Sequence, residues 1–168
     1  GKLNINEYLE FCLEPLSQNN RTTLDGWHQR FMQEKIEKIL LPKAQQVVNQ
    51  HKAKGDTVLV ITATNSFVTA PIVERYGIDN LLATNPEVKQ GQFTGKVEGE
   101  PCFQQGKITH LNKWLEKTGE EMSGAYFYSD SHNDLPMLEL VDNPVVVHGD
   151  DKLKTIAKQR GWPSIDWR

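Results

Sequence analysis

The sequence lacks features typical of membrane-spanning, repeat, disulfide-bonded and nucleic-acid-binding proteins. No apolar run approaches the roughly 18 residues of a membrane-spanning helix, and no internal repeat or low-complexity tract is present. The two cysteines, Cys12 and Cys102, form no Cys-x-x-Cys pair, which is typical of reduced, packed thiols in a cytosolic protein rather than of a disulfide or zinc site. With 19 Lys and Arg against 22 Asp and Glu, the net charge is −3, so there is no basic excess for binding nucleic acid or an anionic membrane.

The length suits one compact domain, with at most a small appendage. A chain of 168 residues buries about 70% of its unfolded surface, so neither a disulfide nor a metal is needed for stability.

Residues 1–41 are predicted to form a small helical subdomain. Apolar residues recur at helical spacing in a first helix, at Ile5, Tyr8, Leu9, Cys12 and Leu13. Pro15 and the polar segment 17–23 are expected to interrupt this helix. A second helix would carry the apolar residues Trp27, Phe31, Ile36, Ile39 and Leu40.

From residue 42 the pattern alternates between helix and strand. Helices are expected over 44–54, through Val68, Ile72, Val73 and Tyr76, and over 107–117 and 151–160, with Gly55, Gly77 and Gly119 as stops. Buried strands are expected over 57–61, 81–83, 125–128 and 144–147, with a last short strand at Ile165 and a β-hairpin over 88–97 that turns near Gly91. This alternation predicts an α/β core over 42–168, with a doubly wound parallel sheet.

The stretch from Tyr126 to Leu138 indicates a functional site. An apolar strand is followed by the polar turn Ser129–Asp134, which is not expected in a core, and then by a short helix with Pro136 in its first turn. Ligands bind at such strand ends in open α/β sheets. Asp130 and Asp134 could be ordinary turn and capping residues. The turn, however, holds two carboxylates, an amide, a hydroxyl and an imidazole, more than one cap requires, and carboxylates are the ligands that Mg²⁺ prefers.

Two further polar residues are placed to join these carboxylates. Thr62 follows the predicted strand 57–61, and Lys107 begins a helix after Gly106. A hydroxyl, the N–H groups of a helix start, a lysine and a Mg²⁺-binding carboxylate together suit a phosphoryl group. A strand-end threonine or a lysine at a helix start is usually structural or solvated, so the order of these residues matters more than each of them alone.

That order resembles a known family. The series Val-Leu-Val-Ile-Thr62, then Lys107, then Tyr-Ser-Asp130-x-x-Asn133-Asp134-Leu-Pro-Met-Leu resembles motifs II, III and IV of the haloacid dehalogenase (HAD) superfamily, in its phosphoserine-phosphatase-like branch. The stretches Ile-Thr-Ala-Thr-Asn and Pro-Cys-Phe-Gln-Gln-Gly-Lys resemble its histidinol-phosphatase-like members. The fourth motif is highly specific, the second moderately so, and the third matches only by position.

The resemblance implies a role for each matching residue. Thr62, with the backbone of Ala63, Thr64 and Asn65, would bind the phosphoryl group, and Lys107 would stabilise its charge. Asp130 would bind Mg²⁺ directly, Asp134 would support metal-bound water or Lys107, and Asn133 would face the substrate. Residues 1–41 would be most of a helical cap, with three candidates for substrate contact, Trp27, His28 and Phe31; His132 matches no motif position.

One family motif has no match. HAD enzymes carry an N-terminal strand that ends in Asp-x-Asp, whose first aspartate attacks phosphorus and whose second is a general acid and base. Asp150-Asp151 lacks that spacing, and Asp56 precedes its strand rather than following it. We therefore expect this chain to be the C-terminal portion of a longer protein and to be inactive alone, because loss of a central strand would expose two apolar edges.

Three functions compete at this point. The first is a Mg²⁺-dependent phosphatase of small phosphorylated metabolites, with histidinol phosphate and phosphoserine among its possible substrates. The second is a non-catalytic remnant that binds a phosphate ligand or a partner. The third, a phosphoacceptor receiver domain, requires the acceptor aspartate before the threonine, whereas the order here is Thr62, Lys107, Asp130.

Overall fold

The computed structural model describes residues 4–167 and divides the chain into two compact units, Gly1–Phe103 and Gln104–Arg168. The first unit contains, in order, α1 (Ile5–Ser17), α2 (Arg21–Phe31), the π-helical η1 (Met32–Ile36), α3 (Pro42–Lys54), β1 (Leu59–Asn65), α4 (Ser66–Arg75), β2 (Asn80–Thr84), β3 (Pro86–Lys89) and β4 (Gln92–Val97). The second contains α5 (Gln105–Thr118), β5 (Tyr126–Ser129), the 3₁₀ turn η2 (His132–Asp134), α6 (Leu135–Leu138), β6 (Asn143–Val147), α7 (Asp151–Arg160) and β7 (Ser164–Ile165).

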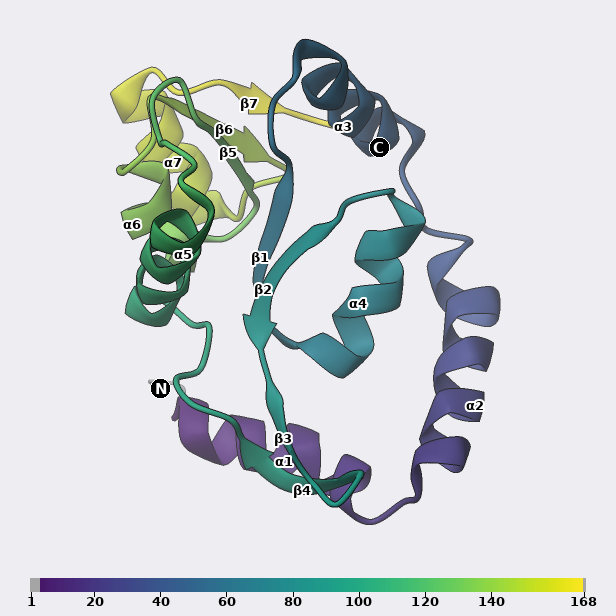
Figure 1. The fold of residues 1–168 in the computed structure, drawn as a ribbon. Coiled ribbons are helices and arrows are strands. Elements are labelled where there is room, and N and C mark those ends of the chain that lie inside the picture. The colour runs from purple at the N-terminus through teal and green to yellow at the C-terminus, as the bar shows by residue number, and fades with distance from the viewer. Residues whose placement is uncertain (1–3, 168) are drawn as a thin grey trace. The chain divides into compact units, whose positions relative to one another are not determined.

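A parallel β1–α4–β2 crossover forms the centre of the first unit (Figure 1). The strands pair in register from Leu59 with Asn80 to Thr62 with Ala83. Asn65 ends β1 and caps α4, because its side-chain oxygen accepts a hydrogen bond of 3.0 Å from the Val68 N–H. The start of α4 is thereby fixed directly after the end of β1.

The hairpin β3–β4 packs against the first helices. Its two-residue turn, Gln90 and Gly91, has positive φ at both positions (50° and 78°), a geometry that matches the twist of paired strands. Figure 1 shows α1 alongside β4. One apolar cluster joins these elements, with Leu13, Leu16, Leu24 and Phe93 buried and Phe67 and Val97 packed against them.

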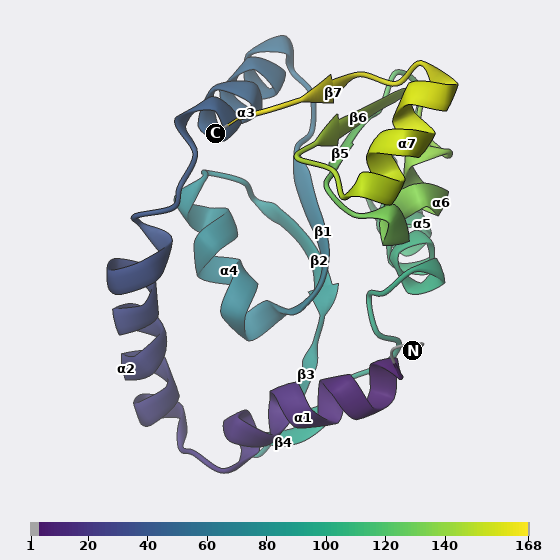
Figure 2. The same cartoon turned by 180° about the vertical axis from the view of Figure 1, so that it is seen from behind.

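The second unit holds the parallel strands β5, β6 and β7 in that order (Figure 2). Its core, Leu138, Val146, Leu153 and Ala157, joins α6 and α7 to β6, and Phe127 and Trp162 pack against it. Within residues 4–167, all strand pairs except the hairpin are parallel, so the predicted α/β class with parallel sheets is confirmed.

Four local predictions are wrong. Helix α1 continues through Pro15 to Ser17. The second helix ends at Phe31 and changes to π geometry over Met32–Ile36, so Ile39 and Leu40 are not part of it. Strand β1 runs from Leu59 to Asn65 rather than over 57–61.

The fourth concerns burial. β1 is only half-buried over most of its length, and Tyr126 of β5 is 47% exposed, because each of these strands pairs along one edge alone among the described residues. Ser129 and Asp134, in the turn expected outside the core, are instead 8% and 9% exposed.

The division into a cap over 1–41 and a core over 42–168 stays a prediction.

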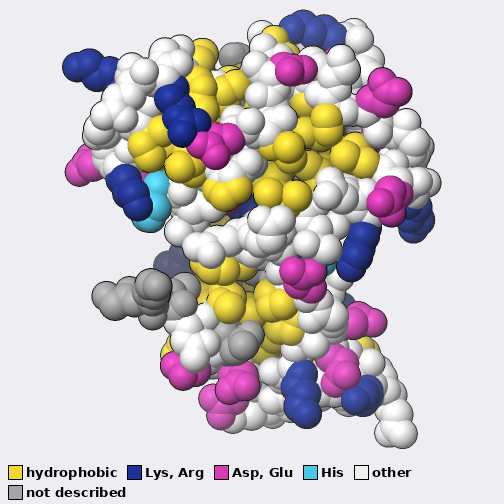
Figure 3. Space-filling view, turned by 90° about the vertical axis from the view of Figure 1, so that its left-hand side faces the viewer, with side chains coloured by type: hydrophobic (Ala, Val, Ile, Leu, Met, Phe, Trp, Pro, Cys, Tyr) yellow, Lys and Arg dark blue, Asp and Glu magenta, His cyan; other side chains and the backbone are white. Residues whose placement is uncertain are grey.

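On the face drawn in Figure 3, acidic and basic side chains are interspersed around exposed hydrophobic ones. None of the helices in residues 4–167 combines the length and the apolar character needed to cross a membrane.

Candidate active site

Thr62 lies in the middle of β1, three residues before this strand ends at Asn65. Its pairing with Ala83 is the last regular one, because the register shifts between Thr62 and Asn65. The Thr62 hydroxyl oxygen accepts a hydrogen bond of 3.2 Å from the Thr64 N–H, within the last residues of β1 before α4. The segment Thr62–Asn65 therefore leads directly into the positive end of a helix dipole, where an anion is stabilised.

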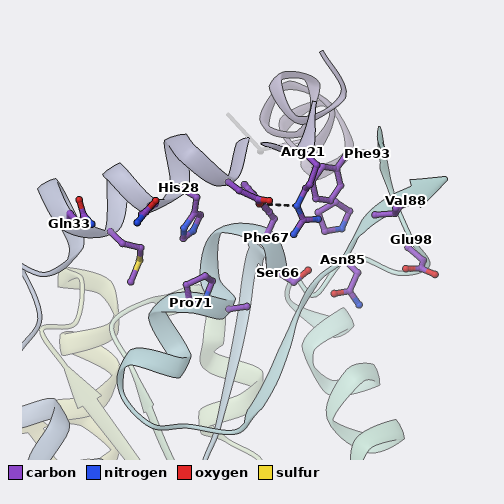
Figure 4. Close-up of a pocket in the computed structure, with 15 residues that line it drawn as sticks. Arg21, His28, Gln33, Ser66, Phe67, Pro71, Asn85, Val88, Phe93 and Glu98 are labelled. Atoms are coloured by element: carbon purple, nitrogen blue, oxygen red, sulfur yellow. Dashed lines mark hydrogen bonds and ion pairs between the residues drawn. The ribbon is translucent and has the colours of Figure 1, made fainter. Parts of the chain in front are cut away.

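A pocket of about 750 Å³ within the first unit is lined in part by Ser66 and Phe67, the two residues that follow this segment. Figure 4 shows side chains from α2, from the start of α4 and from the hairpin lining it. His28 of α2 is among them, and its Nε2 lies 3.0 Å from the carbonyl oxygen of Val68. Its contact with substrate stays a prediction. Trp27 and Phe31 are 51% and 38% exposed and do not line the pocket.

Lys107 and Asp134 form a buried ion pair in the second unit. The Lys107 Nζ lies 2.6 Å from Asp134 Oδ1, and the two side chains are 9% and 12% exposed. The Ser129 hydroxyl donates a 2.8 Å hydrogen bond to Asp134 Oδ2. Because each carboxylate oxygen already accepts a hydrogen bond, Asp134 positions the Lys107 ammonium, one of the two roles expected for it.

Asp130 lies just after β5, and its residue is exposed. Its carboxylate makes no hydrogen bond or ion pair with any residue that the structure describes, while its backbone carbonyl accepts a 2.9 Å hydrogen bond from the Asp150 N–H. Asn133 is also exposed, and its N–H donates to the Ser131 hydroxyl oxygen at 3.2 Å. The Asp130 side chain is thus available to an external ligand, with its backbone held in place.

An interaction that the sequence did not reveal holds this loop. The Asp150 Oδ2 accepts two hydrogen bonds from His132, one of 2.8 Å from the backbone N–H and one of 2.9 Å at ring Nδ1. The other carboxylate oxygen caps α7 through the Leu153 N–H at 2.8 Å. The residues are 18 positions apart, so only the pairing of β5 with β6 brings them together.

These contacts lower the pKa of Asp150. Partial burial raises its pKa, but hydrogen bonds from the His132 and Leu153 N–H groups and from the His132 ring outweigh it and bring the pKa to about 2. A carboxylate with a lowered pKa stabilises the fold above its unfolded value of 3.8, and this stabilisation is lost as the pH falls toward 2.

We expect Asp150→Ala to lower the free energy of unfolding by about 1 kcal/mol through loss of the α7 cap. The variant should also lose less stability than the unchanged protein between pH 4 and pH 2. Urea unfolding curves at several pH values measure both effects, and Asp151→Ala, on the exposed first turn of α7, is the matched control. Equal acid sensitivity of the Asp150 variant and the parent protein would show that this carboxylate is not responsible.

The predicted site residues fall into two groups. Lys107, Asp134 and Asp130 belong to the second unit, where the structure brings Lys107 and Asp134 into contact. Thr62 belongs to the first unit, so its convergence with Lys107 and Asp130 stays a prediction. Within the described part of the chain, no cluster of three or more His, Cys, Asp or Glu side chains is arranged as a metal site. The Asp130 carboxylate, which pairs with no described residue, suits a hard cation. Such a cation would take its other ligands from water, from substrate and from elsewhere in the protein.

Comparison with known proteins gives the family. The haloacid dehalogenase-like hydrolase family model matches residues 7–139, so the chain belongs to that family. A histidinol-phosphatase of Neisseria meningitidis serogroup C is 40% identical over 172 aligned residues, which cover the whole chain and 78% of that protein. Phosphoserine phosphatase SerB1 of Mycobacterium tuberculosis is 35% identical over 73% of the chain, but only 40% of its own length is covered.

Solved structures agree on the fold. A protein of unknown function from Bordetella pertussis Tohama I matches with a TM-score of 0.96 and 42% identity, over the whole chain and 77% of that protein. A substrate-bound phosphoserine phosphatase matches with a TM-score of 0.68 and 23% identity, over 98% of the chain and 73% of that enzyme. The expected family and fold are therefore both confirmed.

Proposed function

We propose that the full-length protein hydrolyses phosphomonoesters of small metabolites, with Mg²⁺, through a phospho-aspartyl enzyme. The observation that carries this proposal is the buried Lys107–Asp134–Ser129 cluster, which holds an ammonium group in place. Ser129 directly precedes Asp130, whose side chain is exposed. Phosphoryl transfer depends mainly on such positioned charges. The relatives of this chain in Neisseria and Mycobacterium are named as phosphatases, which supports the same activity.

Each residue has a role in this reaction. The Thr62 hydroxyl and the N–H groups of Ala63 and Asn65 bind the phosphoryl oxygens, and Thr64 supports them through its N–H, which donates to the Thr62 hydroxyl oxygen. The Lys107 ammonium offsets the charge of the phosphoryl group and of the attacking carboxylate. Asp130 would bind Mg²⁺ directly, Asp134 would hold the Lys107 ammonium in place and support metal-bound water, and Asn133 would face the substrate. Bound Mg²⁺ would supply further charge neutralisation at the phosphoryl group.

The attacking aspartate is proposed to lie on an additional N-terminal strand, outside this sequence. Two observations support this arrangement. Among the described residues β1 pairs only with β2, and β5 only with β6, so each has a free edge that could accept another parallel strand. The acidic candidate in the chain, Asp150, already binds the His132 loop and caps α7. The 168-residue chain alone is therefore expected to be inactive.

The first substrate to test is histidinol phosphate, which the name of the Neisseria relative indicates. We expect the full-length protein to release phosphate from it and from p-nitrophenyl phosphate when Mg²⁺ is present. Removing the metal with EDTA should slow both reactions by at least about 100-fold, because a metal's charge stabilisation is worth several kcal/mol, and added Mg²⁺ should restore them.

A colorimetric phosphate assay measures this result. The non-catalytic alternative predicts the opposite pattern, in which Mg²⁺ or phosphate raises the melting temperature of the full-length protein while no ester is hydrolysed. Activity that is unaffected by EDTA would contradict the metal dependence but leave the phosphatase activity standing.

A further inference from the structure

Asp150, which follows β6, connects the loop that carries Asp130 to α7. Strands β5 and β6 run in parallel, and Ser129, the last residue of β5, pairs with a residue of β6. The loops that follow the two strands therefore begin at the same edge of the sheet (Figure 2). The Asp150 N–H donates to the Asp130 carbonyl at 2.9 Å, and its Oδ2 accepts from the His132 N–H at 2.8 Å. Asp150 thus holds the backbone of this loop at two points.

Asp150 is itself fixed to the core of the second unit. Its other carboxylate oxygen, Oδ1, accepts a 2.8 Å hydrogen bond from the Leu153 N–H and so caps α7. Leu153 is fully buried and belongs to the same apolar cluster as Val146 of β6. The residue before Asp150 is Gly149, where a Cβ atom would collide with the Val146 side chain. The position of Asp150 is therefore set by the packed core.

The two carboxylate oxygens of Asp150 have separate partners. Oδ1 serves the cap of α7, which requires one acceptor. Oδ2 bonds to the other loop, because it accepts from the His132 N–H and lies 2.9 Å from the His132 Nδ1. Asparagine and serine cap helices as well as aspartate does. The cap alone therefore does not explain a side chain with two acceptor oxygens at this position.

The side chain of Asp130 has no such support of its own. It is exposed, and its carboxylate makes no hydrogen bond or ion pair with any residue that the structure describes. Its direction therefore depends on the backbone that carries it. Side chains that bind a metal are commonly oriented by hydrogen-bond partners outside the coordination sphere. In this loop such bonds are made to the backbone, at the Asp130 carbonyl and at the His132 N–H, and both are made by Asp150.

We infer that Asp150 is a positioning residue, which holds the Asp130 carboxylate in the geometry that binds Mg²⁺. Both carboxylate oxygens of Asp150 already accept hydrogen bonds from N–H groups, so it acts through the loop backbone. This inference rests on the proposed function, which assigns Asp130 to the metal. It predicts that substitution of Asp150 weakens Mg²⁺ binding and that a high Mg²⁺ concentration restores turnover.

Two substitutions in the full-length protein keep a helix-capping side chain and remove the second acceptor oxygen. Asp150→Asn keeps the size of the side chain, and Asp150→Ser leaves a single hydroxyl. Either variant should raise the Mg²⁺ concentration for half-maximal hydrolysis of p-nitrophenyl phosphate by about 10–100-fold, the range typical for loss of a partner outside the coordination sphere. The kcat at saturating Mg²⁺ should stay close to that of the parent protein. Asp151→Asn removes the same charge from the next, exposed residue and should leave the Mg²⁺ dependence unchanged.

The melting temperature provides a second measurement that does not depend on turnover. It is followed in the absence of substrate as the Mg²⁺ concentration rises, and the midpoint of this response should shift by the same factor in both Asp150 variants. A purely structural role would lower the melting temperature equally at every Mg²⁺ concentration and leave the midpoint unchanged.

The outcomes separate this inference from the proposed function. If the parent protein hydrolyses no ester, the phosphatase proposal is wrong, while the midpoints of the melting-temperature response still test Asp150. If both Asp150 variants keep the Mg²⁺ midpoints of Asp151→Asn, or if Mg²⁺ changes neither the activity nor the melting temperature of the parent protein, the positioning role of Asp150 is overturned.

Discussion

Asp130→Asn should lower kcat/KM of the full-length protein by at least about 100-fold, the scale on which enzymes lose rate when one charged group that stabilises the transition state is removed. The substitution keeps the size of the side chain and removes its charge. The Asp130 carboxylate makes no hydrogen bond or ion pair with the described residues, so the folded state does not depend on it. We therefore expect the free energy of unfolding to change by no more than about 0.5 kcal/mol.

This combination of results distinguishes a catalytic role from a structural one. Phosphate release from p-nitrophenyl phosphate measures the activity, and urea unfolding of the same sample measures the stability. The matched control is Asp151→Asn, an exposed aspartate in the first turn of α7, which should retain full activity. If Asp130→Asn retains near-wild-type kcat/KM at any Mg²⁺ concentration, Asp130 is not the metal ligand of the proposed reaction.

Local signals in the sequence were sufficient to predict most of the elements. Gly55 and Gly119 both adopt the left-handed conformation that ends a helix. The helix before Gly55 ends at Lys54, as predicted, and the helix before Gly119 ends at Thr118, one residue later than predicted. The turn at Gln90 and Gly91 joins the predicted hairpin. The strand limits were less predictable, because strand pairing depends on partners far along the chain rather than on neighbouring residues.

The candidate site shows the same difference between what local sequence signals predict and what depends on residues far along the chain. Motif order gave Lys107, Asp130 and Asp134 as candidate site residues, but it did not indicate that Ser129 is buried and donates to Asp134. The signal that could have revealed this contact is the position of Ser129 at the end of an apolar strand, where its side chain follows the inward-facing alternation. The pair of His132 and Asp150 had no sequence signal, since it depends on the register between β5 and β6.

Breaking the buried ion pair should have the largest effect on stability. Lys107→Met removes the ammonium and leaves the Asp134 carboxylate buried, with the Ser129 hydroxyl as its remaining donor. Loss of one partner from a buried ion pair costs about 3–5 kcal/mol, a large part of the stability of a typical domain. We expect urea unfolding of the full-length variant to show a loss of this size, together with loss of activity.

A double variant separates the two roles of Lys107. Lys107→Met with Asp134→Asn leaves no buried charge, and the new amide oxygen can still accept the Ser129 hydrogen bond. The loss of unfolding free energy in the double variant should then be smaller than the sum of the losses in the two single variants. The difference should be about 0.5–3 kcal/mol, because an isolated buried charge caused much of the loss in each single variant. Activity should not recover, since the ammonium that offsets the phosphoryl charge is still missing. Additive losses of stability would mean that the 2.6 Å contact between these side chains does not persist in solution, and recovery of turnover would remove Lys107 from the catalytic site.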